Sequence, residues 1–236
     1  MKRTLCFALS VVALVAIPIR SVHAKTIVVA VIDSGVDAAV PNLCHRSHIS
    51  FAKKLPNPLV DENGHGTHIA GLISTNAGTG DYCIVSVKYY DPAMTGLQNL
   101  QNIINAVRYA VSIKVDFINI SGGGPEFSED EFAAIEEALD AKITLVTAAG
   151  NEHSDLDKTC DFFPACYDPR LVVVGNLQKA PEGRAPSSNY GNKVTRWEVG
   201  TDLLSTLPGG KTGRMTGTSQ SAAVATGKLV KEALGK

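Results

Sequence analysis

The sequence contains few of the patterns that mark cofactor-binding or nucleic-acid-binding proteins. It has no G-x-G-x-x-G or Walker A loop, so no segment predicts a dinucleotide or nucleotide site. It also has no G-x-S-x-G turn of the α/β-hydrolase type. Basic clusters are missing and the formal net charge is −1, which argues against nucleic acid as a partner. The composition therefore leaves enzymes that need no bound cofactor among the main candidates.

Charge is modest as well. Only 19% of the 236 residues are charged and 44% are hydrophobic, which is ordinary for a globular protein. No internal repeat, low-complexity tract or linker interrupts residues 25–236. We therefore expect one domain with a sizeable core.

The first 24 residues differ from the rest. A basic start, an apolar run (TLCFALSVVALVAIPI) and a small residue at Ala24 predict a secretory signal peptide that is cleaved after Ala24. The alternative is a transmembrane anchor, although the run is short for a bilayer span. Residues 25–236 hold 19 Lys and Arg against 23 Asp and Glu, a mildly acidic balance. We expect an exported protein, secreted or periplasmic, without stable membrane association after cleavage.

Four cysteines remain after residue 24. An even number in an exported chain suggests disulfides, and four cysteines allow three pairings. Cys160 and Cys166 flank the short segment DFFPA, so we pair them with each other and pair Cys44 with Cys83. The alternative is free buried thiols. A metal site is disfavoured because no C-x-x-C occurs.

Short apolar runs alternate with amphipathic segments along the chain. The runs predict strands over 26–33, 84–90, 115–121, 143–150 and 171–176, and the amphipathic segments predict helices over 97–113 and 128–141. This alternation indicates an α/β fold with three layers (α/β/α) around a mostly parallel, doubly wound sheet. Ligands bind such sheets beyond the carboxyl ends of the strands.

Two helices carry more detailed predictions. Ser128 followed by Glu131 has the spacing of a capping box at the start of the second helix. In the first helix, the apolar residues at helical spacing predict the face that packs on the sheet. These residues are Leu97, Leu100, Ile103, Ile104, Val107 and Val111.

Four polar residues stand at strand ends or helix starts: Asp33, His65, Asn151 and Ser219. Each has an ordinary structural explanation alone, as a turn residue, a packed polar residue or a cap. Together they supply a complete set for acyl transfer. A serine nucleophile needs a base, a histidine base needs an orienting carboxylate, and the oxyanion needs preorganised donors such as a side-chain amide.

The segments around these residues resemble the subtilisin-like serine proteases (the subtilases, peptidase family S8). The resemblance rests on VVAVIDSGV, ENGHGTHIAG, INISGGGP, VTAAGNE and GTSQSAAVATG, which occur in the family's order. It extends over nearly all of residues 25–236. It implies a subtilisin-like fold and no cofactor. It also implies that Ser219 is the nucleophile, His65 the general base and acid, Asp33 the orienting carboxylate and Asn151 an oxyanion donor beside the Ser219 N–H.

The resemblance also assigns the segment Ser121, Gly122, Gly123 and Gly124 to substrate binding, where a peptide would add as an extra strand. His65 and His68 are three residues apart and could suggest a metal pair. A zincin, however, has Glu directly after the first His, where this chain has Gly66. We therefore expect no metal site and expect His68 to be a packed structural residue.

The chain departs from the family pattern in its serine and substrate-binding motifs. Gln220 stands where Met usually follows the serine, and Ala223 and Val224 stand at the usual Pro-His positions. None of these groups transfers a proton, so we expect the chemistry to survive while packing changes. Gly122 stands where Leu is common, and we expect this side of the cleft to be wider.

Two further departures concern segments that many relatives have. The segment LISTNAGTGD is short where relatives carry a calcium-binding loop, so we expect that site to be missing and the Cys44–Cys83 bridge to stabilise the region instead. Asp33 is the ninth residue after the expected cleavage site, which leaves no room for a pro-segment. In relatives the pro-segment assists folding and blocks the cleft. Here the domain folds unaided, or a separate folding partner or inhibitor replaces the pro-segment, or activity is restrained in another way.

The sequence therefore predicts a secreted serine endopeptidase whose catalytic domain is residues 25–236 and whose substrates are polypeptides. Two alternatives stay open. One is a catalytically silent subtilisin-like module that binds extended peptides. The other is a peptide ligase or esterase that uses the same triad.

Overall fold

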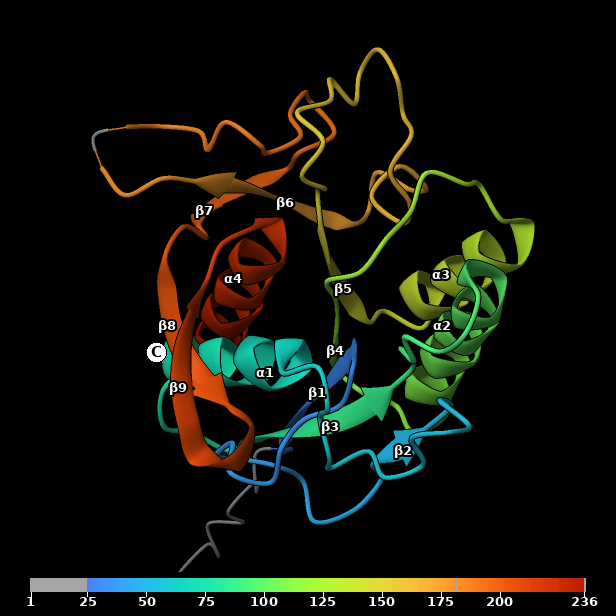
Figure 1. Ribbon diagram of the computed structural model, residues 1–236, viewed down its shortest axis with the longest axis vertical. Coiled ribbons are helices and arrows are strands. Elements are labelled where there is room, and N and C mark those ends of the chain that lie inside the picture. The colour runs from blue at the N-terminus through green and yellow to red at the C-terminus, as the bar shows by residue number, and fades with distance from the viewer. Residues whose placement is uncertain (1–24, 181, 236) are drawn as a thin grey trace, which may run out of the picture.

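A seven-stranded sheet forms the centre of the molecule (Figure 1). The computed structural model describes residues 25–180 and 182–235, so the predicted signal peptide, residues 1–24, lies outside the described residues. All pairs in the sheet are parallel and the order is β2-β3-β1-β4-β5-β6-β7. The strands are β1 (Ile27–Asp33), β2 (Ile49–Ser50), β3 (Tyr82–Lys88), β4 (Phe117–Ile120), β5 (Thr144–Ala148), β6 (Val172–Leu177) and β7 (Arg196–Val199).

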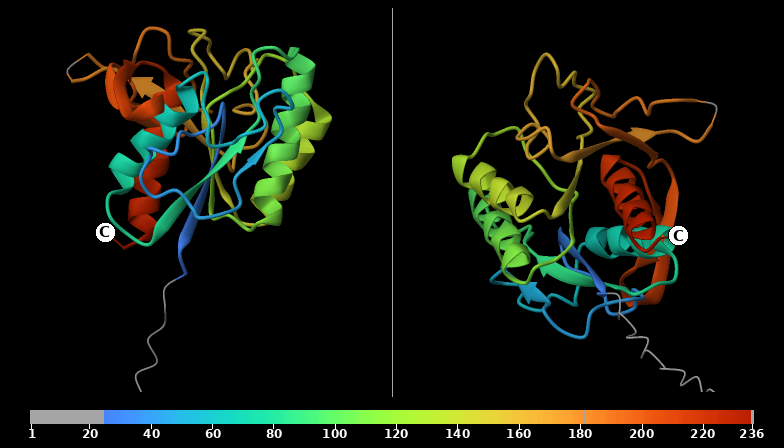
Figure 2. Two further views of the ribbon diagram at one scale, coloured as in Figure 1. Left: turned by 60° about the horizontal axis from the view of Figure 1, so that its bottom comes forward. Right: turned by 180° about the vertical axis from the view of Figure 1, so that it is seen from behind.

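Helices cover both faces of the sheet, as Figures 1 and 2 show. One face carries α1 (His65–Ala77) and α4 (Thr218–Ala233), and the other carries α2 (Gly96–Ser112) and α3 (Glu129–Asp140). This confirms the predicted three-layer α/β fold with a doubly wound parallel sheet. The strands read as continuous apolar runs because both of their faces are buried.

Successive residues of β1 show how the two faces are filled. Val29 and Val31 pack into the core under α1 and α4, while Ala30 and Ile32 pack into the core under α2 and α3. All four are essentially inaccessible to solvent. A strand buried in this way holds the residue at its carboxyl end, Asp33, in a fixed position.

An antiparallel hairpin that the sequence patterns did not predict follows the sheet. It consists of β8 (Leu203–Leu207), the 3₁₀ turn η1 (Pro208–Gly210) and β9 (Lys211–Met215). The buried His68 of α1 donates through Nε2 to the carbonyls of Leu203 (3.0 Å) and Gly213 (3.2 Å). Burial lowers the pKa of this imidazole. His68 is therefore the packed structural residue that was predicted.

Two details of the helix predictions were wrong. Ser128 accepts the Glu131 N–H, but the Glu131 carboxylate accepts the Tyr167 hydroxyl instead of closing a capping box. A complete capping box occurs at the start of α2, between Thr95 and Gln98. In addition, Leu97 lies in the first turn of α2 with 72% of its surface exposed, so it is not part of the core.

The structure contains both of the disulfides that were predicted. Cys44–Cys83 joins the loop before β2 to strand β3, and Cys160–Cys166 closes the short loop that contains Phe162 and Phe163. Within the described ranges, no helix is long and apolar enough to cross a membrane.

Candidate active site

The four polar residues that the sequence singled out come from elements that meet at one edge of the sheet. Asp33 is the last residue of β1, and Asn151 follows β5 closely. His65 begins α1, and Ser219 is the second residue of α4. Carboxyl ends of parallel strands share an edge, and the covering helices begin there. The site is therefore assembled from segments that span nearly the whole domain.

Asp33 and His65 are in direct contact. His65 Nδ1 lies 2.9 Å from Asp33 Oδ1 and 3.0 Å from Oδ2. The carboxylate is buried, whereas the imidazole keeps 30% of its side-chain surface exposed. The charge of Asp33 raises the pKa of His65, although burial of the ring works in the opposite direction. The contact also places the Nδ1 proton toward the carboxylate, which leaves Nε2 free to take up a proton.

Gly66 explains why α1 can start so close to the end of β1. A Cβ atom at Gly66 would lie 2.1 Å from the carbonyl oxygen of Gly35 and 3.0 Å from Cβ of Asp33. Any larger residue would therefore push His65 away from Asp33. The sequence pattern H-G-T-H thus has a steric reason at its second position.

Asp61, which sequence reasoning missed, anchors the start of α1. Its buried carboxylate accepts the N–H groups of Asn63 (3.2 Å), Gly64 (2.8 Å) and Thr67 (2.8 Å) and the hydroxyls of Ser34 (2.8 Å) and Thr67 (2.6 Å). Unpaired N–H groups at a helix start need such acceptors. The negative charge also contributes to raising the pKa of His65. Asp61 therefore fixes the backbone on both sides of His65, at the start of α1.

Ser219 does not cap its helix. The N-cap of α4 is Gly217, without a side-chain cap bond, and the Ser219 hydroxyl donates to the carbonyl of Ser121 (3.0 Å). None of the hydrogen bonds found among the described residues joins Ser219 to His65. Such bonds are often long in free enzymes and tighten when substrate binds. As a first-turn residue, Ser219 has a backbone N–H that lacks a partner within the helix.

Asn151 is oriented by α4. Its Oδ1 accepts the Thr218 N–H at 3.0 Å and the Thr218 hydroxyl at 3.3 Å, which leaves Nδ2 as the donor of this exposed amide. The buried Asn189 braces the loop that carries it. Asn189 donates to the Ala149 carbonyl (2.9 Å) and accepts the Glu152 N–H (3.0 Å). Sequence reasoning missed Asn189, which lies 38 positions further along the chain.

The segment Ser121, Gly122, Gly123 and Gly124 follows β4 at the same edge. Gly124 exchanges two backbone hydrogen bonds with Phe163, at 2.8 and 3.0 Å. A Cβ atom at Gly122 would lie 2.1 Å from the Tyr89 hydroxyl oxygen. Tyr89 therefore occupies the space that a larger residue at position 122 would fill, and the expected wider cleft stays a prediction.

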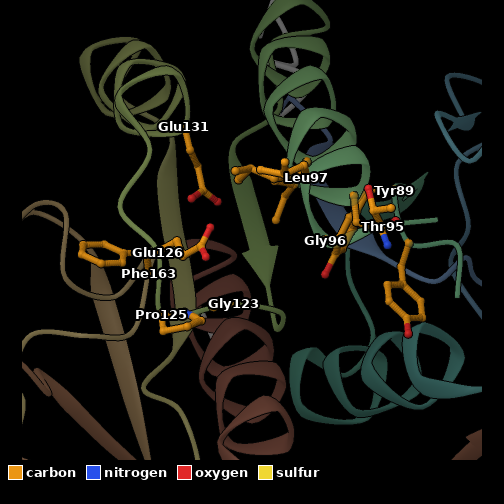
Figure 3. A pocket seen from close by; sticks show the side chains of 14 residues that line it. Tyr89, Thr95, Gly96, Leu97, Gly123, Pro125, Glu126, Glu131 and Phe163 are labelled. Atoms are coloured by element: carbon orange, nitrogen blue, oxygen red, sulfur yellow. The ribbon is translucent and has the colours of Figure 1, made fainter.

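A cavity of about 540 Å³ adjoins this segment (Figure 3). Gly96 and Leu97 line one side, whereas Glu126, Glu131 and Phe163 line the other. Burial raises the pKa of Glu131, whose carboxylate accepts the Tyr167 hydroxyl at 2.7 Å. The cavity is large enough for a side chain of a bound peptide.

The residues that depart from the family pattern lie inside α4. Gln220 is buried, with Nε2 3.9 Å from the Met215 sulfur. Ala223 belongs to the core that includes Ile69 of α1, and Val224 is buried too. None of the three side chains can transfer a proton, and all three pack inside the domain. Over the ranges that the structure describes, no group of three or more His, Cys, Asp or Glu side chains could hold a metal ion.

Comparison with known proteins agrees with this geometry. The sequence profile of the subtilase family matches residues 24–233. Subtilisin of Bacillus pumilus is 36% identical over 200 residues, which are 82% of this chain and 71% of that protein. The chain belongs to the subtilase family of serine peptidases. A solved cold adapted subtilisin-like serine proteinase gives a TM-score of 0.72 at 25% identity, over 86% of this subtilase and 74% of that chain.

The relatives of this subtilase differ in length, and one is named as an intracellular protease. The major intracellular serine protease of Bacillus subtilis (strain 168) is 33% identical over 225 residues, 89% of this chain and 69% of that protein. Against subtilisin E of the same organism, the match covers 82% of this chain but only 51% of that protein. Membership of the family therefore does not show whether this subtilase is exported.

Proposed function

We propose that this subtilase is a serine endopeptidase that hydrolyses peptide bonds through an acyl-enzyme on Ser219. The observation that carries the proposal is the contact of the buried Asp33 carboxylate with His65 Nδ1, at the sheet edge where Ser219 and Asn151 also lie. A serine becomes a nucleophile when a neutral imidazole takes its proton. The raised pKa of His65 suits it to hold that proton as the bond forms.

The reaction has two halves. In the first, Ser219 Oγ attacks the peptide carbonyl carbon while His65 Nε2 takes the hydroxyl proton. His65 then gives this proton to the amine nitrogen, the C–N bond breaks, and the acyl group stays on Ser219. In the second, a water molecule loses a proton to His65 and attacks the ester. The proton returns to Ser219 Oγ as the carboxylic acid leaves.

Negative charge on the carbonyl oxygen is stabilised by two donors, Nδ2 of Asn151 and the backbone N–H of Ser219. The bonds from Thr218 to Asn151 Oδ1 support this assignment because they occupy the acceptor end of the amide and leave Nδ2 as the donor. The Ser219 N–H lies in the first turn of α4, where the helix dipole also favours negative charge. Fixed donors of this kind need no reorganisation during the reaction.

The peptide substrate lies along the segment that begins at Ser121. In an extended segment, successive residues direct their N–H and C=O groups to opposite sides. Gly124 already directs its groups to Phe163, so Gly123 directs its own groups to the opposite side, where a peptide strand can pair with them. Side chains on such a strand then reach the neighbouring cavities.

We also propose that the protein is exported. The amino-terminal pattern supports this, and so do the two disulfides, since such bonds persist mainly outside the reducing cytosol. Expression of the full chain with export assayed by fractionation tests the proposal. Retention of the uncleaved chain in the cell would overturn it.

The activity is tested with a fluorophosphonate probe on residues 25–236 and on the matched Ser219→Ala variant. We expect labelling of the wild type only, and hydrolysis of a denatured protein by the wild type only. A folded wild type that resists labelling but retains peptides would indicate a silent binding module. Labelling accompanied by ester cleavage or peptide joining, without proteolysis, would indicate an esterase or a ligase.

A further inference from the structure

The inference concerns the side chain of the substrate residue whose carbonyl Ser219 attacks, and it rests on the proposed function. Ser219 lies between two segments that follow neighbouring strands. Its hydroxyl contacts Ser121 after β4, and its neighbour Thr218 contacts Asn151 after β5. A peptide paired with the first segment, with its carbonyl oxygen on Asn151, directs this side chain into the slot between the two segments.

That slot is already filled by the ring of Phe162. A Cβ atom at Gly123, on the first segment, would lie 2.7 Å from Cζ and 2.8 Å from Cε1 of Phe162. A Cβ atom at Gly150, on the second segment, would lie 2.8 Å from Cγ of the same ring. The ring therefore reaches from one wall to the other. Together with the Phe163 carbonyl beside Gly123 and the Asn189 and Glu152 side chains beside Gly150, it leaves no room for a larger residue in either wall.

The backbone around Phe162 holds the ring in this place. The neighbouring Phe163 exchanges two hydrogen bonds with Gly124, and the Phe162 carbonyl accepts the Cys166 N–H at 3.1 Å. The Cys160–Cys166 disulfide closes the loop around both phenylalanines. The loop that carries the ring is therefore fixed, and the ring is held in the slot between Gly123 and Gly150.

We propose that Phe162 determines specificity by closing this slot, so that the residue that supplies the scissile carbonyl must be small, such as Gly, Ala or Ser. A bulky side chain would have to displace the ring from between Gly123 and Gly150. The larger cavity beside Gly123 lies outside this slot and is free to take another side chain of the peptide. The packed ring of Phe162 then excludes large side chains at this position of the substrate.

The test uses two peptides that differ only in this residue, Ala or Phe, with kcat/KM as the readout. We expect the wild type to favour the Ala peptide by about 100-fold, in the range that a steric pocket achieves. Phe162→Ala should raise kcat/KM for the Phe peptide at least about tenfold while the Ala peptide changes little. Phe162→Val keeps more of the packing and should give an intermediate gain.

Phe127→Ala is the matched control, because Phe127 is an exposed ring that packs on Phe163 and lies outside the slot walls. It should leave the ratio of the two peptides unchanged. A labelled wild type that cleaves the Phe peptide as well as the Ala peptide would overturn the role of Phe162. A wild type that is neither labelled nor able to cleave either peptide would instead overturn the proposed function, and this inference with it.

Discussion

At the residue scale, the pairing of His65 with Asp33 sets the pH at which the site works. The carboxylate charge raises the pKa of His65 above its ordinary value near 6.5, and only the neutral imidazole accepts the Ser219 proton. The acid limb of the kcat/KM profile should therefore have its midpoint above pH 6.5. Rates measured from pH 5 to 9 with a neutral peptide test this.

Asp33→Asn removes that charge, so the midpoint should move to lower pH. The turnover number should fall by about 10⁴, as expected when the imidazole loses its orienting carboxylate. Asp81→Asn is the matched control, because Asp81 is exposed, lies outside the site and bonds the Thr26 side chain and the Ile27 backbone. An acid limb that stays in place in Asp33→Asn would contradict the assigned pair.

At the element scale, one buried carboxylate, that of Asp61, binds several groups at the start of α1. Asp61→Ala would leave the N–H groups of Asn63, Gly64 and Thr67 without their acceptor, and Gly64 and Thr67 are buried. We expect the free energy of unfolding to fall by about 3 kcal/mol, since bonds to a charged group are the stronger kind. The turnover number should fall as well, because His65 is the first residue of this helix.

Urea unfolding in the Ser219→Ala background measures the free energy of unfolding without self-digestion. Peptide hydrolysis by the variants that retain Ser219 measures the turnover number. Asp61→Asn retains one acceptor oxygen and should lie between wild type and Asp61→Ala. Asp81→Ala should change neither quantity. Equal stability of Asp61→Ala and Asp81→Ala would show that the carboxylate does not anchor the helix.

The elements that carry the site were predictable because local patterns define them. Apolar runs marked β1, β4 and β5, and parallel strands bring their carboxyl ends to one edge, so Asp33 and Asn151 were expected to lie near each other. The hairpin strand β9 was missed because it is KTGRM, a largely exposed segment without alternating apolar residues. Its only sheet partner is β8, among the described residues.

The supporting residues of the site could not be predicted for a different reason. Asp61 binds the side chain of Ser34, 27 positions away, and Asn189 and Phe162 contact segments up to about 40 positions away. No local pattern records such contacts. The segment DFFPA between two cysteines was a signal for a disulfide, but only the folded loop places the Phe162 ring between Gly123 and Gly150.

At the scale of the whole molecule, the two disulfides constrain the chain by different amounts. Cys44 and Cys83 are 39 positions apart and tie the region before β2 to strand β3, whereas Cys160 and Cys166 are 6 positions apart. A crosslink that closes a longer loop removes more entropy from the unfolded chain. The Cys44–Cys83 bridge therefore stabilises the fold as a whole, and the Cys160–Cys166 bridge mainly fixes the loop that holds Phe162.

Replacement of both cysteines of a pair by alanine separates these roles. Loss of Cys44–Cys83 should lower the free energy of unfolding by about 4 kcal/mol and loss of Cys160–Cys166 by about 2 kcal/mol, both measured by urea unfolding in the Ser219→Ala background. In the active enzyme, only loss of Cys160–Cys166 should weaken the preference for the Ala peptide over the Phe peptide, because only that bridge closes the loop around Phe162. Equal stability losses, or a preference that shifts with the Cys44–Cys83 pair instead, would contradict this division between fold and specificity.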